Sequence, residues 1–185
     1  MIRTLHQLYT YLDELFYEIE VDCIRCEFSR CLGYVWLLSE EAEILVDRGV
    51  EVLEVNQEIF FINSFPEEKG EIDIEKFKPK CVFLENGRCS IHMQRPLSCR
   101  MYPLSFWTED DKLQLVLHLD CLFSKRRIRS QEFKNLSLAL FGDLDRSLLG
   151  RIREAYIKVF TISKFPRGGN NFIILGTLPP AKERR

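Results

Sequence analysis

Apolar residues near the start of the chain recur every three or four positions, which is the spacing of one face of an α-helix. Acidic residues occupy several of the positions between them. The pattern predicts an amphipathic helix over residues 4–20, which ends where Val21-Asp22-Cys23 begins a loop. A second, short helix is predicted after Ser39, whose side chain is typical of an N-cap, and Gly49 closes it. The apolar positions of the first helix are Leu5, Leu8, Tyr9, Leu12, Phe16 and Ile19.

Apolar runs of strand length follow in the middle and at the end of the chain. Residues 50–64 predict two strands around Asn56-Gln57, and the turn signal Asn86-Gly87 predicts a hairpin between Cys81 and Cys89. Such a hairpin would bring these two cysteines side by side. Further strands are predicted over residues 112–119 and 171–178.

Helical spacing returns after Ser130 and is interrupted once, at Gly142-Asp143. Gly142 suits the end of one helix, and Asp143 suits the N-cap of the next. Because the apolar stripe of these helices contains no cysteine or histidine, we expect it to pack as core and to carry no chemistry. The stripe comprises Leu136, Leu140, Leu144, Leu148, Ile152 and Tyr156.

Helices combined with small antiparallel strands predict an α+β fold. The length of 185 residues is ample for a single hydrophobic core. We expect a cysteine-bearing, metal-binding domain over residues 1–124. A helical extension with a C-terminal strand and tail, residues 125–185, is expected to pack on it.

Charge and hydropathy argue against two classes of partner. The 26 Lys and Arg residues nearly balance the 28 Asp and Glu residues, so no basic field would hold nucleic acid. The basic run over residues 125–129 lacks interleaved aromatic residues, and we interpret it as the solvated approach to a helix. No apolar run approaches the roughly 18–20 residues that span a bilayer. Since the acidic N-terminus does not resemble a signal peptide, we expect a cytoplasmic protein with reduced thiols and no nucleic-acid or membrane partner.

Seven cysteines are the main chemical feature of the sequence. Two residues between thiolates let a short loop wrap a metal ion while backbone N–H groups point at the sulfurs. The C-x2-C pair and a second group around the predicted hairpin therefore predict a shared metal centre. The candidate ligands are Cys23, Cys26, Cys31, Cys81, Cys89, Cys99 and Cys121.

Three other roles for these cysteines are open. Some of them would be small, buried, apolar side chains. Structural disulfides would need an oxidising compartment. A thioredoxin-like C-x-x-C is disfavoured because a helix precedes this pair and a loop follows it, which is the opposite of the order such a motif needs.

The number of thiols leaves the number of metal centres open. A closed zinc site takes four ligands, and an iron–sulfur cluster usually takes four thiolates. Seven thiols are more than one such site needs and one fewer than two sites need. Three explanations are open: one thiolate bridges two metal ions, a cysteine binds no metal, or another side chain supplies the eighth ligand. His92, three residues after Cys89, is the first candidate for that ligand, followed by His118 and His6.

The second cysteine group, from Cys81 to Pro103, is C-V-F-L-E-N-G-R-C-S-I-H-M-Q-R-P-L-S-C-R-M-Y-P. It resembles the YkgJ-type cysteine-cluster family, also described as CxxCxxCC or the zinc- or iron-chelating domain, whose pattern here is roughly C-x-F-L, a short gap and C-x-I-Y-x-x-R-P-x-x-C-R-x-Y-P. Upstream, C-I-R-C-E-F-S-R-C-L-G from Cys23 to Gly33 resembles the opening cluster of the family, and Cys121 stands where a further cysteine commonly follows. The resemblance covers about residues 20–125 and implies a cysteine-ligated iron–sulfur or zinc centre.

Two positions depart from the family pattern. Leu32 follows Cys31 where the family usually has adjacent cysteines, and His92 stands where it usually has tyrosine. Five arginines lie within four residues of a cysteine, where a positive charge would offset the negative charge of metal-bound thiolates. They are Arg25, Arg30, Arg88, Arg95 and Arg100.

These features support three functions. The preferred hypothesis is an iron–sulfur protein in a redox, electron-transfer or sensing role, with an unidentified protein or redox partner. The second is a zinc-stabilised binding module without catalysis. The third is an accessory to a protein-modifying enzyme, because flagellin lysine methylases share a similar cysteine cluster. The sequence has no P-loop, H-E-x-x-H or G-x-S-x-G motif, so these motifs give no support for catalysis by this chain alone. Whether the chain is itself an enzyme stays open.

Overall fold

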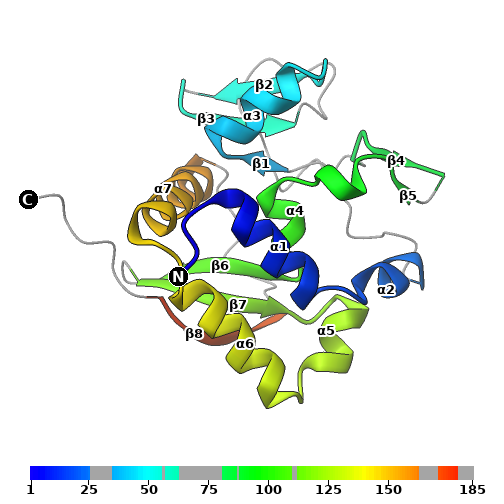
Figure 1. The fold of residues 1–185 in the computed structure, drawn as a ribbon, viewed down its shortest axis with the longest axis vertical. Helices are drawn as coiled ribbons and strands as arrows, with labels where there is room; N and C mark the ends of the chain where they lie inside the picture. Colours follow the sequence, from blue (N-terminus) through cyan, green and yellow to red (C-terminus); the bar gives the residue numbers. More distant parts are fainter. Residues whose placement is uncertain are drawn as a thin grey trace, which may run out of the picture.

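The computed structural model describes residues 1–25, 35–55, 57–62, 81–86, 88–109, 112–162 and 171–178, and its fold is α+β, as expected (Figure 1). The helices are α1 (Leu5–Leu15), α2 (Ile19–Arg25), α3 (Ser39–Val46), α4 (Leu97–Met101), α5 (Leu122–Arg127), α6 (Gln131–Gly142) and α7 (Arg146–Ile162), with a 3-10 turn η1 (His92–Gln94). The strands are β1 (Trp36–Leu37), β2 (Val52–Val55), β3 (Ile59–Ile62), β4 (Leu84–Glu85), β5 (Arg88–Cys89), β6 (Leu104–Glu109), β7 (Lys112–His118) and β8 (Phe172–Thr177). The strands form three small antiparallel sheets, ordered β1-β3-β2, β4-β5 and β6-β7-β8.

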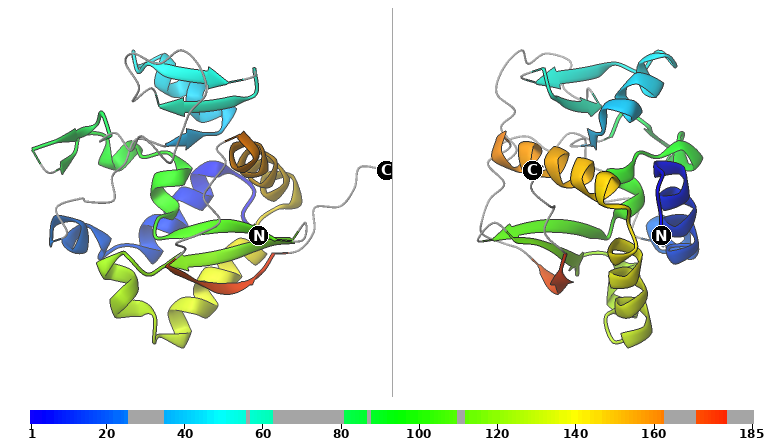
Figure 2. Two further views of the ribbon diagram at one scale, coloured as in Figure 1. Left: turned by 180° about the vertical axis from the view of Figure 1, so that it is seen from behind. Right: turned by 60° about the vertical axis from the view of Figure 1, so that its left-hand side comes forward.

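The main core lies between the β6-β7-β8 sheet and the helices that pack on one of its faces (Figure 2). In the β6–β7 pair Leu104 is opposite Leu117 and Phe106 is opposite Leu115, and all four side chains are buried. Phe106 also contacts the rings of Phe141 from α6 and Tyr156 from α7, both edge-on at 5.4 Å between ring centroids. One sheet face therefore gathers helices from both halves of the chain, and the boundary proposed at residue 124 stays a prediction.

A second, smaller core lies under the β1-β3-β2 sheet, against α3. Its buried members are Val35, Leu37, Ala42, Leu45 and Ile62. The partly buried side chains of Phe83 and Cys99 pack against it, although they come from a distant part of the chain. The predicted strands around Asn56-Gln57 are confirmed as β2 and β3, and Gly49 ends the α3 turn with a φ of +78°, a conformation that favours glycine.

The first helix differs from the prediction, because the chain forms two helices instead of one. Helix α1 ends at Leu15, and α2 then runs through Cys23, which was expected in a loop. The turn lets Phe16 reach the rings of Phe123 and Phe133, at 5.6 and 6.2 Å between ring centroids, while Ile19 is also buried. On α2, the buried carboxylate of Asp22 pairs with Arg126 of α5.

The predictions for α6 and α7 are only partly right. Leu144, Leu148, Ile152 and Tyr156 are buried, but Leu140 is only half-buried and Leu136 is 53% exposed, so the expected stripe does not include its first residue. Helix α6 instead buries Phe133, Ser137 and Phe141, and it begins after Ser130, as the apolar spacing predicted; the Ser130 side chain accepts the N–H of Phe133 and forms the N-cap.

The start of α7 also differs from the prediction. The expected N-cap, Asp143, offers its backbone carbonyl to the N–H of Ile2 at 2.8 Å. The Asp145 carboxylate instead accepts the N–H of Ser147 at 2.9 Å, which places the cap two residues later. The last predicted strand is confirmed as β8. No helix in the described ranges has the length and apolar character required to cross a membrane.

We predict that Leu148→Ala lowers the free energy of unfolding by about 2–5 kcal/mol, because the side chain is 1% exposed and its loss leaves a cavity. Leu136→Ala is the matched control, since the same substitution on the exposed side of α6 removes little buried surface. Urea unfolding measures both. Metal content per folded molecule should be unchanged in Leu148→Ala, and loss of metal from fully folded protein would contradict a purely structural role.

Candidate metal centre

The predicted hairpin between Cys81 and Cys89 is confirmed. Strands β4 and β5 pair Leu84 with Cys89, and Asn86 in the turn has a φ of +48°, in the left-handed region that the Asn-Gly signal favours. The Ser90 N–H donates to the carbonyl of Phe83 at 2.8 Å and extends the pairing past Cys89. The two thiols are close enough that negative charge on Cys89 raises the pKa of Cys81.

Each of these thiols accepts a backbone hydrogen bond from the residue two positions later. The N–H of Phe83 donates to the sulfur of Cys81, and the N–H of Ile91 donates to the sulfur of Cys89. Burial raises the pKa of both thiols, and these N–H bonds oppose that rise because they stabilise the thiolate. The hairpin is thus shaped to hold two thiolates once a cation offsets their charge.

Cys99 lies on α4, ten residues after Cys89, and its half-buried side chain packs against the smaller core. Phe83, whose N–H reaches the Cys81 sulfur, packs against the same core. The hairpin and α4 therefore share one packing surface. The short segment that joins them contains η1, Arg95 and Pro96.

Helix α4 is held at its N-terminus by a buried carboxylate from α3. Glu41 is 5% exposed and accepts the N–H of Leu97 at 2.6 Å, the N–H of Leu38 at 2.8 Å and the hydroxyl of Tyr9. Burial raises the pKa of Glu41, and these three donors oppose the rise. The sequence indicated only that Glu41 lies in the first turn of a helix, so its link to α4 was missed; no local pattern shows a partner 56 residues away.

Two of the five arginines near cysteines, Arg95 and Arg100, form ion pairs in this region. Arg100 is 6% exposed, donates to the carbonyls of Arg95 and Met93 at 2.7 and 2.6 Å, and pairs with Asp13 on α1. Arg95 lies 3.5 Å from the same carboxylate, and its charge helps to lower the pKa of Cys89 against the effect of burial. Arg88 and Arg25 are exposed, and Arg30 lies outside the described residues.

The helix that carries Cys23 lies near the turn that follows Cys89. The pKa of His92 is lowered mainly by burial and then by the charge of Arg95, while Glu20 on α2 and Asp13 on α1 act in the opposite direction. Glu20 is therefore within electrostatic reach of His92. In Figures 1 and 2, α2 and the β4–β5 hairpin lie at the same end of the molecule. Cys26 and Cys31, which follow α2 in sequence, lie outside the described residues.

The remaining candidates are placed elsewhere or have other contacts. Cys121 is buried in the main core and forms the N-cap position of α5, which packs against α2. His118 lies 2.7 Å from the hydroxyl of Ser105, measured from Nε2, and its ring stacks on that of Tyr102. His6 is exposed on α1. Within the described ranges, no three Cys, His, Asp or Glu side chains are grouped closely enough to hold a metal ion.

The donor chemistry nevertheless fits a zinc or iron centre, since partly buried thiols with backbone N–H donors and a nearby arginine suit both metals. In the comparison with known families, the CxxCxxCC family model, described as "Putative zinc- or iron-chelating domain", matches residues 22–131. The comparisons with curated proteins and with solved structures gave no match. Because the matched segment covers more than half of the chain and includes all seven cysteines, the protein belongs to the CxxCxxCC family of zinc- or iron-chelating domains.

Proposed function

We propose that this metal-binding protein holds an iron–sulfur cluster and acts in a redox, electron-transfer or sensing role. The observation that carries the proposal is the pair of thiols at Cys81 and Cys89, each with its own N–H donor and with Arg95 nearby. Hydrogen bonds to sulfur and local charge are the means by which proteins set the reduction potential of such clusters. The proposed ligands are drawn from Cys23, Cys26, Cys31, Cys81, Cys89, Cys99 and Cys121.

The proposed setting is the cytoplasm, with a redox protein as the partner. Thiols remain reduced in that compartment and are therefore free to bind metal. Burial raises the pKa of Cys81 and Cys89, so both are neutral thiols at pH 7 in the metal-free chain. Metal binding would then release protons from them.

A zinc-stabilised binding module is the second candidate, and the smaller core favours it. That core has five fully buried residues, while Cys99 and Phe83 complete one side of it. So few apolar side chains bury little surface, and a structural metal would supply the missing stabilisation. In this case the helices would contact a partner and the metal would take no part in electron transfer.

Purification in the absence of oxygen distinguishes the two candidates. We expect a brown protein that contains iron and acid-labile sulfide and loses its colour on oxidation, because thiolate-bound clusters absorb visible light. Metal analysis and visible absorption spectra provide the measurement. Colourless protein with stoichiometric zinc under the same conditions would contradict the iron–sulfur proposal and support the zinc module.

We predict that Cys99→Ala lowers the thermal stability of the metal-loaded protein far more than Lys112→Ala does. The free energy of binding a structural metal adds to the free energy of folding, whereas Lys112 is exposed at the start of β7. Differential scanning calorimetry of both variants and the unsubstituted protein, each with and without a strong chelator, measures the effect.

The chelator separates ligation from simple packing. If Cys99 binds metal, its effect on the melting temperature should become small once metal has been removed from all three proteins. An equally large effect of Cys99→Ala in chelated protein would show that the side chain stabilises only by its contact with the smaller core.

A further inference from the structure

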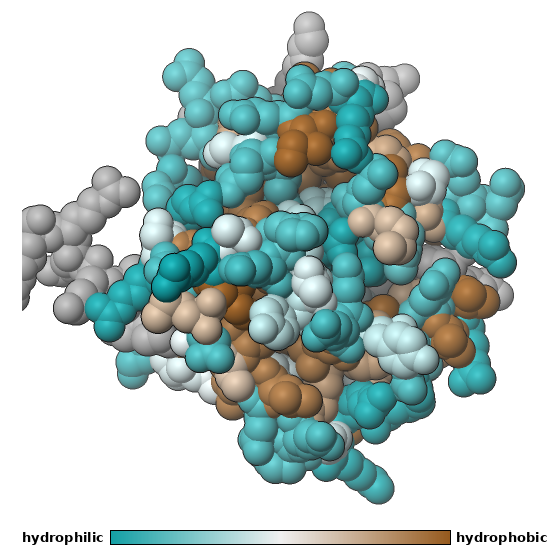
Figure 3. Space-filling model, in the orientation of Figure 1, coloured by the Kyte–Doolittle hydropathy of each residue, from teal (hydrophilic) through white to brown (hydrophobic). Residues whose placement is uncertain are grey.

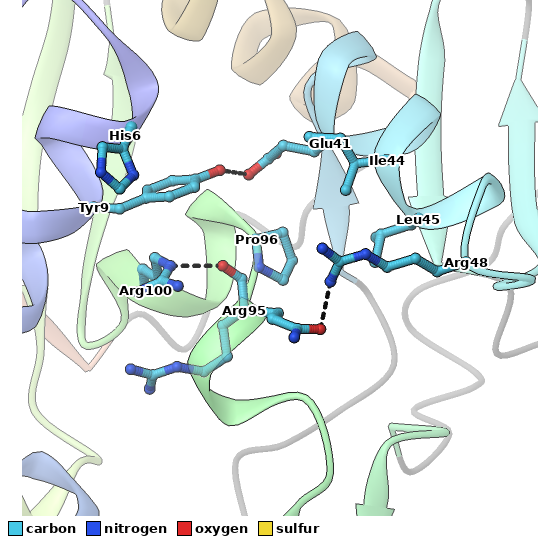
Figure 4. A pocket seen from close by; sticks show the side chains of 10 residues that line it. His6, Tyr9, Glu41, Ile44, Leu45, Arg48, Arg95, Pro96 and Arg100 are labelled. Atoms are coloured by element: carbon cyan, nitrogen blue, oxygen red, sulfur yellow. Dashed lines mark hydrogen bonds between the residues drawn. The ribbon is translucent and has the colours of Figure 1, made fainter.

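A hollow of about 280 Å3 lies beside the proposed metal centre, between α1, α3 and the segment that joins Cys89 to Cys99 (Figure 4). Its lining combines charged side chains with an apolar surface. The charged and polar groups belong to His6, Tyr9, Glu41, Arg48, Gln94, Arg95 and Arg100, and the apolar surface is formed by Ile44, Leu45 and Pro96. None of the functions proposed above uses this hollow.

The negative group in the lining is already satisfied by the protein. Glu41 accepts hydrogen bonds from Tyr9, Leu38 and Leu97, and Figure 4 shows the Tyr9 hydroxyl directed at its carboxylate. Burial raises the pKa of both Glu41 and Tyr9, in agreement with their position at the back of the hollow. Glu41 therefore does not act as the binding group for a cationic ligand.

Two of the three arginines in the lining are also committed to protein partners. Arg100 and Arg95 both pair with Asp13, and Arg100 donates to two backbone carbonyls as well. Arg48 differs, because in the described part of the chain its guanidinium has no ion pair and donates to the neutral side chain of Gln94. In Figure 4 it extends from the turn after α3 along one side of the hollow. Arg48 is thus the one arginine of the lining that has no ion pair among the described residues.

The apolar side of the hollow is incompletely covered. Ile44 is 52% exposed, whereas Leu45 and Pro96, which also line the hollow, are buried. In Figure 3 brown atoms mark the surface of α3, whose exposed apolar residues are Ile44 and Val46. An uncovered apolar side chain next to an uncompensated guanidinium is the lining expected for a ligand with one charged end and one apolar end.

We propose that this hollow binds a small organic anion with a single carboxylate and a compact apolar body. The carboxylate would pair with the guanidinium of Arg48, which presents parallel N–H donors suited to it. The apolar body would cover Ile44. Inorganic phosphate fits less well, because it has no apolar body to cover Ile44.

The site would adjoin the metal centre, because Gln94, Arg95 and Pro96 lie between Cys89 and Cys99 in the chain. A ligand in the hollow would therefore contact the segment that joins two proposed metal ligands. The proposal itself does not depend on which metal the protein holds, and it can fail while the metal-binding function stands.

Sodium benzoate and benzamide form a matched pair of probes, since they share one ring and differ in charge. In a titration of the metal-loaded full chain followed by amide NMR shifts, benzoate should shift residues of the hollow such as Leu45 and Gln94. Benzamide should bind about tenfold more weakly, as expected when a charge-assisted hydrogen bond is lost. Equal binding of the two probes, or shifts confined to other regions, would overturn the proposal.

Arg48→Gln should weaken benzoate binding by about tenfold, whereas Arg3→Gln, which changes an exposed arginine outside the hollow, should leave it unchanged.

Ile44→Ser should weaken the binding of benzoate but not that of acetate, which lacks the apolar ring. Unaltered benzoate binding in Arg48→Gln would overturn the assignment of the anchoring residue. Displacement of benzoate by an equal concentration of inorganic phosphate would overturn the preference for a carboxylate with an apolar body.

Discussion

The buried carboxylate of Glu41 is the interaction on which the arrangement of the metal-binding region depends. A carboxylate taken out of water is unfavourable unless donors replace its hydration, and here Tyr9, Leu38 and Leu97 supply them from three separate elements. The result is a junction between α1, the start of α3 and the start of α4. Because removal of any one element leaves the carboxylate short of a donor, the three elements are constrained together. Helix α4 carries Cys99, so this junction fixes one proposed ligand relative to the smaller core.

A second polar junction orients the other side of the same segment. Asp13 on α1 binds both Arg95 and Arg100, and Arg100 in turn donates to two carbonyls of the turn before it. The guanidinium of Arg100 also lies over the ring of Tyr9, at 4.6 Å from its centroid. Helix α1 therefore acts as a support for the segment between Cys89 and Cys99 through side chains rather than through apolar packing alone. A substitution that removes either junction would therefore displace the segment between Cys89 and Cys99, although it changes neither cysteine.

Local signals in the sequence predicted the elements that depend on local chemistry. Asn86-Gly87 predicted the hairpin, because a tight turn is decided by a few adjacent residues. The apolar spacing after Ser130 predicted the start of α6. Features that depend on distant partners were missed or wrong: Cys23 lies on a helix held by Asp22 and Arg126, and Leu136 faces outward. Strand β6 was also missed, although it pairs with β7, the next strand along the chain. For the site, the sequence indicated which residue types bind metal and which thiols share a hairpin. It could not show the N–H donors to sulfur or the role of Glu41, since both depend on backbone conformation and tertiary contacts.

The charge of the hairpin is linked to metal binding through the pKa of its thiols. In the metal-free chain, burial raises the pKa of Cys81 and Cys89, and negative charge on Cys89 raises the pKa of Cys81 further. The N–H donors and Arg95 oppose this rise in pKa but do not cancel it. A cation is therefore still needed before both sulfurs can ionise together. Asp13 pairs with Arg95, whose charge lowers the pKa of Cys89. The surroundings would thus favour thiolates only when a metal is bound, and occupancy of the proposed centre would then depend on pH.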